Sequence, residues 1–285
     1  MQAASKGVKN NNKWGMFCIP GIAKLDHLRL AADNGISFVR VGTDIDKVET
    51  SAPFINLANI LNLEVFSNFM KSYVLTPVEF ARLASKSRDF GAKIIYLVDS
   101  AGCMMPNEVR TYFKAAREEA PNVPLGFHGH NNLGMAVANS LVALEEGAVI
   151  IDSSLQGLGR SSGNTSSEIL LCALSRSGYK VDIDLLKTMD LGERYIRPRI
   201  KCRGYSSLDI TAGFAQFHSS YMPKILDIAK KFRIDPRMLI IELCRYDKIN
   251  APKDLINQIA INLKSRNILF NAFEYSDYYG EEQNF

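Results

Sequence analysis

Short apolar segments alternate with amphipathic helical patterns six times between residues 14 and 177 of this chain. The segments with strand character are 14–19, 38–42, 64–69, 93–98, 125–130 and 149–153. Helical spacing of apolar residues follows each of them, at 23–33, 51–61, 77–90, 106–118, 133–145 and 167–177. Strands that alternate with helices of this length predict a parallel β-sheet with crossover helices.

The spacing of these six units restricts the choice of α/β folds. Successive strands lie close to the ~31 residues that one βα unit occupies in an eight-unit barrel. A closed barrel needs about eight strands for consistent tilt and filling, and six do not close the ring. The sequence therefore predicts an α/β fold, a (β/α)8 TIM barrel that lacks its first two βα units. The alternatives are an open sheet and a barrel that a partner completes.

The pattern changes near residue 184 to consecutive helices without strands, at 210–232, 235–246 and 252–266. We expect three parts: a partial TIM-barrel catalytic domain at 1–183, a helical domain at 184–266, and a loosely held tail at 267–285. The tail is expected to be loose because its last residues, from 274 on, are acidic and polar.

Composition excludes several classes of protein. Hydrophobic residues make up 47% of the chain and charged residues 22%, which is enough apolar material for a globular core. The 34 basic and 30 acidic residues are interleaved, so no basic stripe predicts nucleic-acid binding. No apolar run is long enough to cross a membrane. Five widely spaced cysteines without a CxxC pattern are typical of reduced thiols in a cytoplasmic protein.

Two histidines, His128 and His130, stand at the end of the predicted strand 125–130. Residues two apart in a strand point to the same face, so both imidazoles can converge on one point at the carboxyl end of the sheet. Such a pair is a ready metal chelate. The alternative is two unrelated polar histidines at the end of a strand.

Two further motifs fall at carboxyl ends of strands. Asp99 and Ser100 open an Asp-Ser-Ala-Gly turn after strand 93–98, although such residues also favour helix caps and turns without any catalytic role. A glycine-rich loop at 157–164 leads into a helix. In barrels such a loop often binds phosphate or carboxylate, and the alternative is a flexible connection.

The residues at 128–140 (HGHNNLGMAVANS) and 157–164 (GLGRSSGN) resemble the DRE-TIM metallolyases. That superfamily includes 3-hydroxy-3-methylglutaryl-CoA lyase, isopropylmalate and homocitrate synthases, and 4-hydroxy-2-oxovalerate aldolase. The segments 19–22 and 26–28, and the segment 213–220 with 227–231 after it, are most similar to the aldolases. The resemblance extends from about residue 14 to about residue 264.

The resemblance implies roles for five residues. His128 and His130 match the metal-binding pair of the family, and Asn164 matches an asparagine that approaches the metal in lyase relatives. Ser100 matches a residue that contacts the pyruvate part of the substrate. His218 falls where the aldolases have a tyrosine that donates a proton. Substrate contacts are thus expected from Ser100, His128 and His218.

The resemblance also implies an activity and a cofactor. We expect a metal-dependent aldolase that cleaves a 4-hydroxy-2-oxo acid, such as 4-hydroxy-2-oxovalerate, to pyruvate and an aldehyde. Mn²⁺ is the first choice of divalent metal, with Mg²⁺, Co²⁺ and Zn²⁺ as alternatives. Two other functions stay open. One is Claisen-type acyl transfer of the isopropylmalate synthase kind, favoured by Arg160 in the glycine-rich loop. The other is a non-catalytic pseudoenzyme.

One family motif has no counterpart in this sequence. The first strand of the family ends in Arg-Asp-Gly, whose aspartate completes the metal site, and a histidine base follows it. We therefore expect a truncated chain with weak metal binding and little or no lyase activity. By resemblance, the partners are a small 2-oxo acid substrate, an acylating aldehyde dehydrogenase docked on the helical domain, and further copies in a homo-oligomer.

Overall fold

A computed structural model of the chain describes residues 1–8, 12–200 and 206–266. These residues form two compact units. The first consists of 1–98, 107–127 and 142–151, and it contains most of the β-sheet. The second consists of 99–106, 128–141 and the described residues from 152 onward. It contains the loops that follow three of the strands, together with the C-terminal helices.

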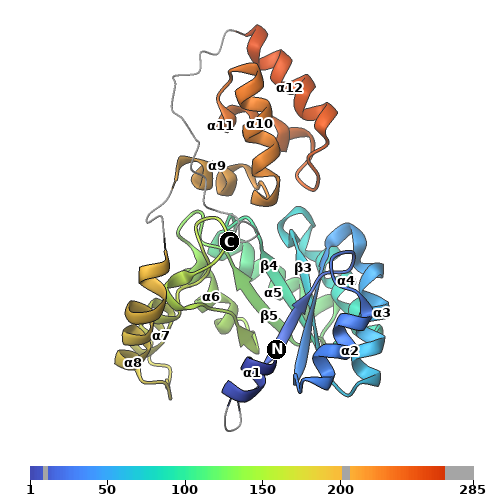
Figure 1. The fold of residues 1–285 in the computed structure, drawn as a ribbon, viewed down its shortest axis with the longest axis vertical. Coiled ribbons are helices and arrows are strands. Elements are labelled where there is room, and N and C mark those ends of the chain that lie inside the picture. Colours follow the sequence, from blue (N-terminus) through green and yellow to red (C-terminus); the bar gives the residue numbers. More distant parts are fainter. Residues whose placement is uncertain (9–11, 201–205, 267–285) are drawn as a thin grey trace. The chain divides into compact units, whose positions relative to one another are not determined.

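Six strands form one sheet in the sequential order β1 to β6, curled into a half-barrel (Figure 1). Their bounds are β1 Gly15–Cys18, β2 Phe38–Asp44, β3 Glu64–Met70, β4 Ile94–Asp99, β5 Leu125–Gly129 and β6 Ile150–Ile151. Strand β2 pairs with β3 in parallel from Phe38 opposite Glu64 to Asp44 opposite Met70. Sequential order and parallel pairing are the result of repeated βα crossovers.

A helix follows each strand. These helices are α2 Leu25–Asp33, α3 Ala52–Ile60, α4 Pro77–Asp89, α5 Pro106–Glu119, α6 Ala136–Glu145 and α7 Ser167–Arg176. Short 3₁₀ turns, η1 Ile45–Ser51 and η2 Ser72–Val74, precede α3 and α4. The start of α4 is fixed by its local sequence, because Thr76 and Glu79 form a reciprocal capping box and Pro77 occupies the first turn.

Alternate strand residues fill the two faces of the sheet. Phe66, Tyr96 and Val98 form an apolar cluster, and Phe38, Ile94 and Ile150 pack against it. The opposite face presents fully buried aliphatic side chains, among them Val39, Val65 and Ile95. Since both faces are apolar, the strands have the near-continuous hydrophobic character of parallel sheets.

The predicted α/β fold with a parallel sheet is confirmed. All six predicted strands and the six helices that follow them are present, with ends shifted by at most three residues. The sequence patterns missed two helices. One is α1 Gln2–Gly7 in the polar start of the chain, and the other is α8 Leu185–Leu191.

The C-terminal helices build a core of their own. After α8 come η4 Gly192–Ile196 and η5 Arg197–Arg199, and then α9 Ser207–Ala215, η6 Ser219–Tyr221, α10 Met222–Phe232, α11 Pro236–Tyr246 and α12 Lys253–Ser265. One cluster of buried side chains joins α9 to α12, with Leu208, Met222, Leu239 and Ile256 contributed by the four helices in turn. Amphipathic helices of this length gain most of their stability from such shared packing.

The single helix predicted at 210–232 is wrong. The helix α9 ends at Ala215, and Gln216 takes up the left-handed conformation with φ 60°, which terminates it. Phe217 is then buried, and His218 caps the 3₁₀ turn η6 that leads into α10. The apolar spacing continued through this break because both helices pack on the same core.

None of the described helices combines the length and the hydropathy that crossing a bilayer requires. The cysteines in the described part of the chain are free thiols: Cys18, Cys103, Cys172 and Cys244. Burial raises the pKa of Cys18 and that of Cys244 to about 12, so both remain protonated near neutral pH. Cys202 and the predicted tail at 267–285 lie outside the described residues.

Candidate functional site

Polar residues gather in the second unit at the carboxyl ends of three strands. Asp99 is the last residue of β4, His128 belongs to β5 and His130 follows it, and Asp152 follows β6. The carboxyl ends of parallel strands are where α/β barrels place their active sites. The strand pattern in the sequence therefore brings these side chains to one end of the sheet.

The two histidines predicted to pair lie side by side. The ring centroids of His128 and His130 are 5.2 Å apart, and the ring planes meet at 73°. Their two-residue spacing along the strand accounts for this arrangement. The structure thus brings together the imidazoles that the sequence analysis selected.

His128 is oriented by a carboxylate. Its Nδ1 lies 2.8 Å from Oδ2 of Asp152. A carboxylate can only accept at this contact, so Nδ1 of His128 carries the proton and donates it. In the neutral ring Nε2 then presents its lone pair. The sequence analysis did not single out Asp152, although a carboxylate near the end of the predicted strand 149–153 was a usable signal.

Arg160 contacts His130 at both ring nitrogens. Nδ1 of His130 lies 3.2 Å from the backbone oxygen of Arg160, which fixes the proton on Nδ1. The other nitrogen, Nε2, lies 3.4 Å from Nη2 of the Arg160 guanidinium. Burial, and after it the positive charge of Arg160, hold the pKa of His130 well below its usual range. His130 is therefore a neutral imidazole whose lone pair is on Nε2.

Asp99 and Ser100 shape the turn after β4. The Asp99 carboxylate accepts hydrogen bonds from the backbone N–H groups of Cys103 at 3.0 Å and Met104 at 2.9 Å. This is the turn-forming role that the sequence left open for an aspartate here. Ser100 is buried, and its backbone oxygen accepts a hydrogen bond from Nη2 of Arg160 at 3.2 Å.

The glycine-rich loop 157–164 lies against His130. Residues His130 and Asn164 form an isolated antiparallel bridge. The amide nitrogen of Asn164 donates to the backbone oxygen of Leu158 at 3.1 Å, and its Oδ1 is buried without a hydrogen-bond partner in the described structure. A Cβ on Gly163, where φ is 86°, would stand 2.2 Å from the oxygen of Gly157, so the loop requires glycine there.

Arg160 also connects this loop to η6. One guanidinium nitrogen, Nη1, donates to Oγ of Ser219, and Ser219 is buried at the start of η6. The neighbouring His218 is partly exposed, and its Nδ1 contacts Oγ of Ser220 at 2.7 Å. Its ring lies 6.1 Å from that of Tyr221. His218 thus caps a short turn beside the residue that binds Arg160, instead of projecting from a long helix as predicted.

A second polar network joins the same loop to α9. Ser161 donates to Oδ1 of Asp209 at 2.6 Å, and the Asn132 amide donates to Oγ of Ser161 at 2.7 Å and to the backbone oxygen of Asp209 at 2.9 Å. Asp209 is buried, and the sequence analysis did not identify it. The local signal at Asp209 is its helix cap, since Ser206 donates to Oδ2 of Asp209 at 2.7 Å and accepts from its backbone N–H at 3.0 Å. The contacts to Ser161 and Asn132, which are 48 and 77 positions away, follow from no local pattern.

The sequence comparisons agree on one family. The family model described as HMGL-like matches residues 27–194. The 4-hydroxy-2-oxovalerate aldolase of Geobacillus genomosp. 3 is 39% identical over 254 residues, which cover 89% of this chain and 75% of that protein. The protein of the same name from Carboxydothermus hydrogenoformans is 34% identical over 268 residues, covering 94% and 79%. The chain belongs to the HMGL-like family. The resemblance seen in the sequence is thereby confirmed.

Solved structures share the fold of this HMGL-like protein. The carboxyl transferase domain of Rhizobium etli pyruvate carboxylase has a TM-score of 0.71 at 18% identity, and the match covers 90% of this chain and 48% of that one. The chain thus spans about half the length of that structure. The N-terminal domain of a Bacteroides vulgatus protein has a TM-score of 0.64 at 23% identity, with 87% and 78% covered. At these identities the likeness establishes the fold alone.

The donor set of this HMGL-like protein fits a divalent metal in its chemistry. His128 and His130 each have Nδ1 engaged by an acceptor, which orients the ring and leaves Nε2 as the donor atom for a metal. Asn164 adds a buried oxygen that accepts no hydrogen bond in the described structure. Two imidazoles and an amide oxygen suit a first-row divalent ion. Across the described residues, no three His, Cys, Asp or Glu side chains come together as a metal-binding group.

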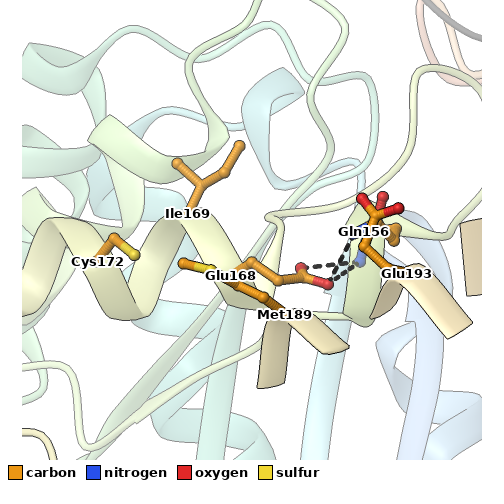
Figure 2. A pocket seen from close by; sticks show the side chains of 6 residues that line it. All are labelled: Gln156, Glu168, Ile169, Cys172, Met189 and Glu193. Carbon is orange, nitrogen blue, oxygen red and sulfur yellow. Dashed lines mark hydrogen bonds between the residues drawn. The ribbon is translucent and has the colours of Figure 1, made fainter. Parts of the chain in front are cut away.

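A separate cavity of about 470 Å³ opens beside α7 (Figure 2). Its lining comes from η3 Leu155–Gly157, α7, α8 and η4, through Gln156, Glu168, Ile169, Cys172, Met189 and Glu193. The Glu168 carboxylate accepts hydrogen bonds from the backbone and side-chain nitrogens of Gln156. Glu168 therefore holds η3 against α7, which is a structural role.

Proposed function

We propose that this HMGL-like protein is a metal-dependent carbon–carbon lyase that cleaves a 4-hydroxy-2-oxo acid to pyruvate and an aldehyde. The observation that carries the proposal is the pair His128 and His130, whose rings lie together with both Nδ1 atoms engaged. The relatives at 39% and 34% identity are named for this activity on 4-hydroxy-2-oxovalerate. A compound of that kind is the proposed substrate.

The proposed metal ligands are His128, His130 and Asn164. Nitrogen and oxygen donors of this kind accept Mn²⁺, which we propose first, and also Mg²⁺, Co²⁺ or Zn²⁺. When bound, such an ion supplies Lewis acidity toward the charge that develops on the 2-oxo group. Because the proposed protein ligands are only two imidazoles and one amide, we propose that the ion is held weakly.

Ser100 and His218 are the proposed substrate contacts besides His128. Ser100 ends up buried in the turn after β4, where its hydroxyl would contact the pyruvate part of the substrate. His218 accepts from the Ser220 backbone N–H at Nδ1, so its Nε2 carries the proton in the neutral ring. We propose that this Nε2–H is the proton donor to the substrate.

The wider architecture completes the proposal. We infer that the six strands belong to a (β/α)8 ring, with residues 1–183 as the barrel part and 184–266 as a helical domain. The sequential parallel sheet supports the barrel part, and the core shared by α9 to α12 supports the helical domain. Two strands that would close the ring are not among those described. A docked acylating aldehyde dehydrogenase, a homo-oligomer and a cytoplasmic location are proposed from the resemblance.

The decisive experiment is a single-turnover assay with the protein in excess over 4-hydroxy-2-oxovalerate. Pyruvate is measured through lactate dehydrogenase, with and without Mn²⁺, and the Geobacillus relative serves as the positive control. We expect slow, Mn²⁺-dependent pyruvate release that His130→Ala abolishes. Pyruvate release that does not depend on Mn²⁺, or that His130→Ala retains, would overturn the metal-dependent lyase proposal. Absence of both pyruvate release and Mn²⁺ binding, where the relative shows both, would favour a non-catalytic protein. Thiol release from acetyl-CoA in the presence of a 2-oxo acid would instead favour acyl transfer.

A further inference from the structure

One residue, Arg160, holds His130 from both sides. Its backbone oxygen lies 3.2 Å from Nδ1, and its guanidinium nitrogen Nη2 lies 3.4 Å from Nε2. The first contact places the ring proton on Nδ1, so the second directs an N–H donor at the lone pair of Nε2. That lone pair is the one His130 would offer to a metal ion.

The guanidinium and a metal ion cannot use this lone pair together. Zn²⁺, one of the proposed ions, binds an imidazole nitrogen at about 2.0–2.1 Å, where the lone pair of the nitrogen points. Nη2 of Arg160 is only 3.4 Å from Nε2, so an ion bound to Nε2 on that side would overlap the guanidinium. Repulsion between a divalent ion and a fixed positive charge adds to the steric conflict. Arg160 must therefore move away before His130 can bind metal.

Three of the contacts that the guanidinium makes are to neutral acceptors. Besides Nε2 of His130, it donates to Oγ of Ser219 and to the backbone oxygen of Ser100, at 3.2 Å for the latter. A carboxylate is a stronger partner, because it accepts two parallel hydrogen bonds from a guanidinium and carries the opposite charge. A 2-oxo acid brings such a carboxylate to the site.

We propose that Arg160 couples metal binding to the binding of a 2-oxo acid. Without the acid, the guanidinium occupies Nε2 of His130 and weakens metal binding. The carboxylate of the acid draws the guanidinium off and releases His130 to the ion. The inference rests on the proposed function, because it takes the metal and the 2-oxo acid from it. It adds a residue that makes the two ligands bind synergistically.

Mn²⁺ titrations of the wild-type protein and Arg160→Gln, each with and without pyruvate, test the coupling. Free Mn²⁺ is measured by electron paramagnetic resonance, so no turnover is needed. Arg176→Gln is the matched control, because it removes an exposed arginine in the last turn of α7. Thermal melts check that each variant is folded.

In the absence of pyruvate, we expect Arg160→Gln to bind Mn²⁺ about tenfold more tightly than the wild type, because the variant removes the charged competitor for Nε2 and couplings between sites are typically about 5- to 150-fold. Pyruvate should tighten Mn²⁺ binding at least about fivefold in the wild type, and by a smaller factor in Arg160→Gln. Arg176→Gln should behave as the wild type. Mn²⁺ affinity of Arg160→Gln equal to or below that of the wild type, or equal enhancement by pyruvate in both, overturns the coupling. Mn²⁺-dependent pyruvate release would leave the lyase proposal standing in either case.

Discussion

Asp152 and His128 are joined by a 2.8 Å contact between Oδ2 and Nδ1, which links the residue after β6 to the end of β5. The carboxylate fixes the ring orientation and the tautomer of His128. Removing an outer-shell carboxylate of this kind lowers metal affinity about 10- to 100-fold.

Accordingly, we expect Asp152→Ala to weaken Mn²⁺ binding by that factor, measured by calorimetric titration. Asp182→Ala is the control, because Asp182 is 77% exposed and pairs with Lys180 at the surface. Unchanged affinity in Asp152→Ala would show that the carboxylate does not orient a metal ligand.

His218 provides the test of the proton donor. Losing a general acid reduces the rate of the chemical step by about 10²–10⁴-fold. We expect His218→Ala to show such a loss in the single-turnover rate of pyruvate release, whereas His218→Tyr, which keeps a donor, retains most of it. Ser220→Ala is a useful companion, because it removes the 2.7 Å contact that positions the ring. A His218→Ala rate equal to that of the wild type would remove His218 from the reaction.

Gly102 is required by the turn that underlies the site. Its φ is 60°, and an added Cβ would lie 2.4 Å from the backbone nitrogen of Asn132 and 2.8 Å from the backbone oxygen of His130. We expect Gly102→Ala to destabilise the fold by more than the ~1–2 kcal/mol that a left-handed alanine alone costs. Urea unfolding measures the difference.

The control variant Gly147→Ala separates the backbone strain of a left-handed alanine from the steric clash of its Cβ. Gly147 has φ 93°, and an added Cβ there meets no atom within 4 Å. Backbone strain is then the main cost, about 1–2 kcal/mol. If both variants lose the same stability, the close approach of Asn132 and His130 to Gly102 does not contribute.

The ion pairs of the Glu146 carboxylate stabilise the fold, and we expect this stabilisation to be lost in acid. The carboxylate is bound by the guanidinium groups of Arg117 and Arg110, and the hydrogen bond from Arg117 contributes most to lowering the pKa of Glu146. A carboxyl pKa that is lower in the folded state stabilises the fold above its unfolded value of about 4.3 and loses this effect as the pH falls through the folded value.

We therefore expect Glu146→Gln to lower the free energy of unfolding at pH 7 by up to about 1 kcal/mol, a modest value because both arginines are partly exposed. At pH 3 the difference from the wild type should shrink. Glu145→Gln is the control, since Glu145 is 53% exposed and pairs with Arg110 at the longer distance of 3.4 Å. If the difference in free energy of unfolding between the wild type and Glu146→Gln grew at pH 3, the stabilising role of the Glu146 ion pairs would be contradicted.

Local sequence determined the parts of this protein that depend on short-range periodicity. The alternation of apolar strands with helical patterns fixed six βα units, because side chains repeat every second residue in a strand and about every 3.6 in a helix. The same two-residue period placed His128 and His130 on one face of the strand. Both stand at the carboxyl end of that strand, which is where barrels have their active sites. Capping signals such as Thr76 and Glu79 set helix ends for the same local reason.

Tertiary structure decided the contacts that give the site its chemistry. Arg160 reaches His130 across 30 positions and Asp152 reaches His128 across 24, so only the path of the loops and the register of the sheet could bring them together. The break at Gln216 was equally hidden, because the apolar pattern on both sides of it serves one core. Periodicity records which face is buried, whereas the choice of partner depends on how distant segments pack.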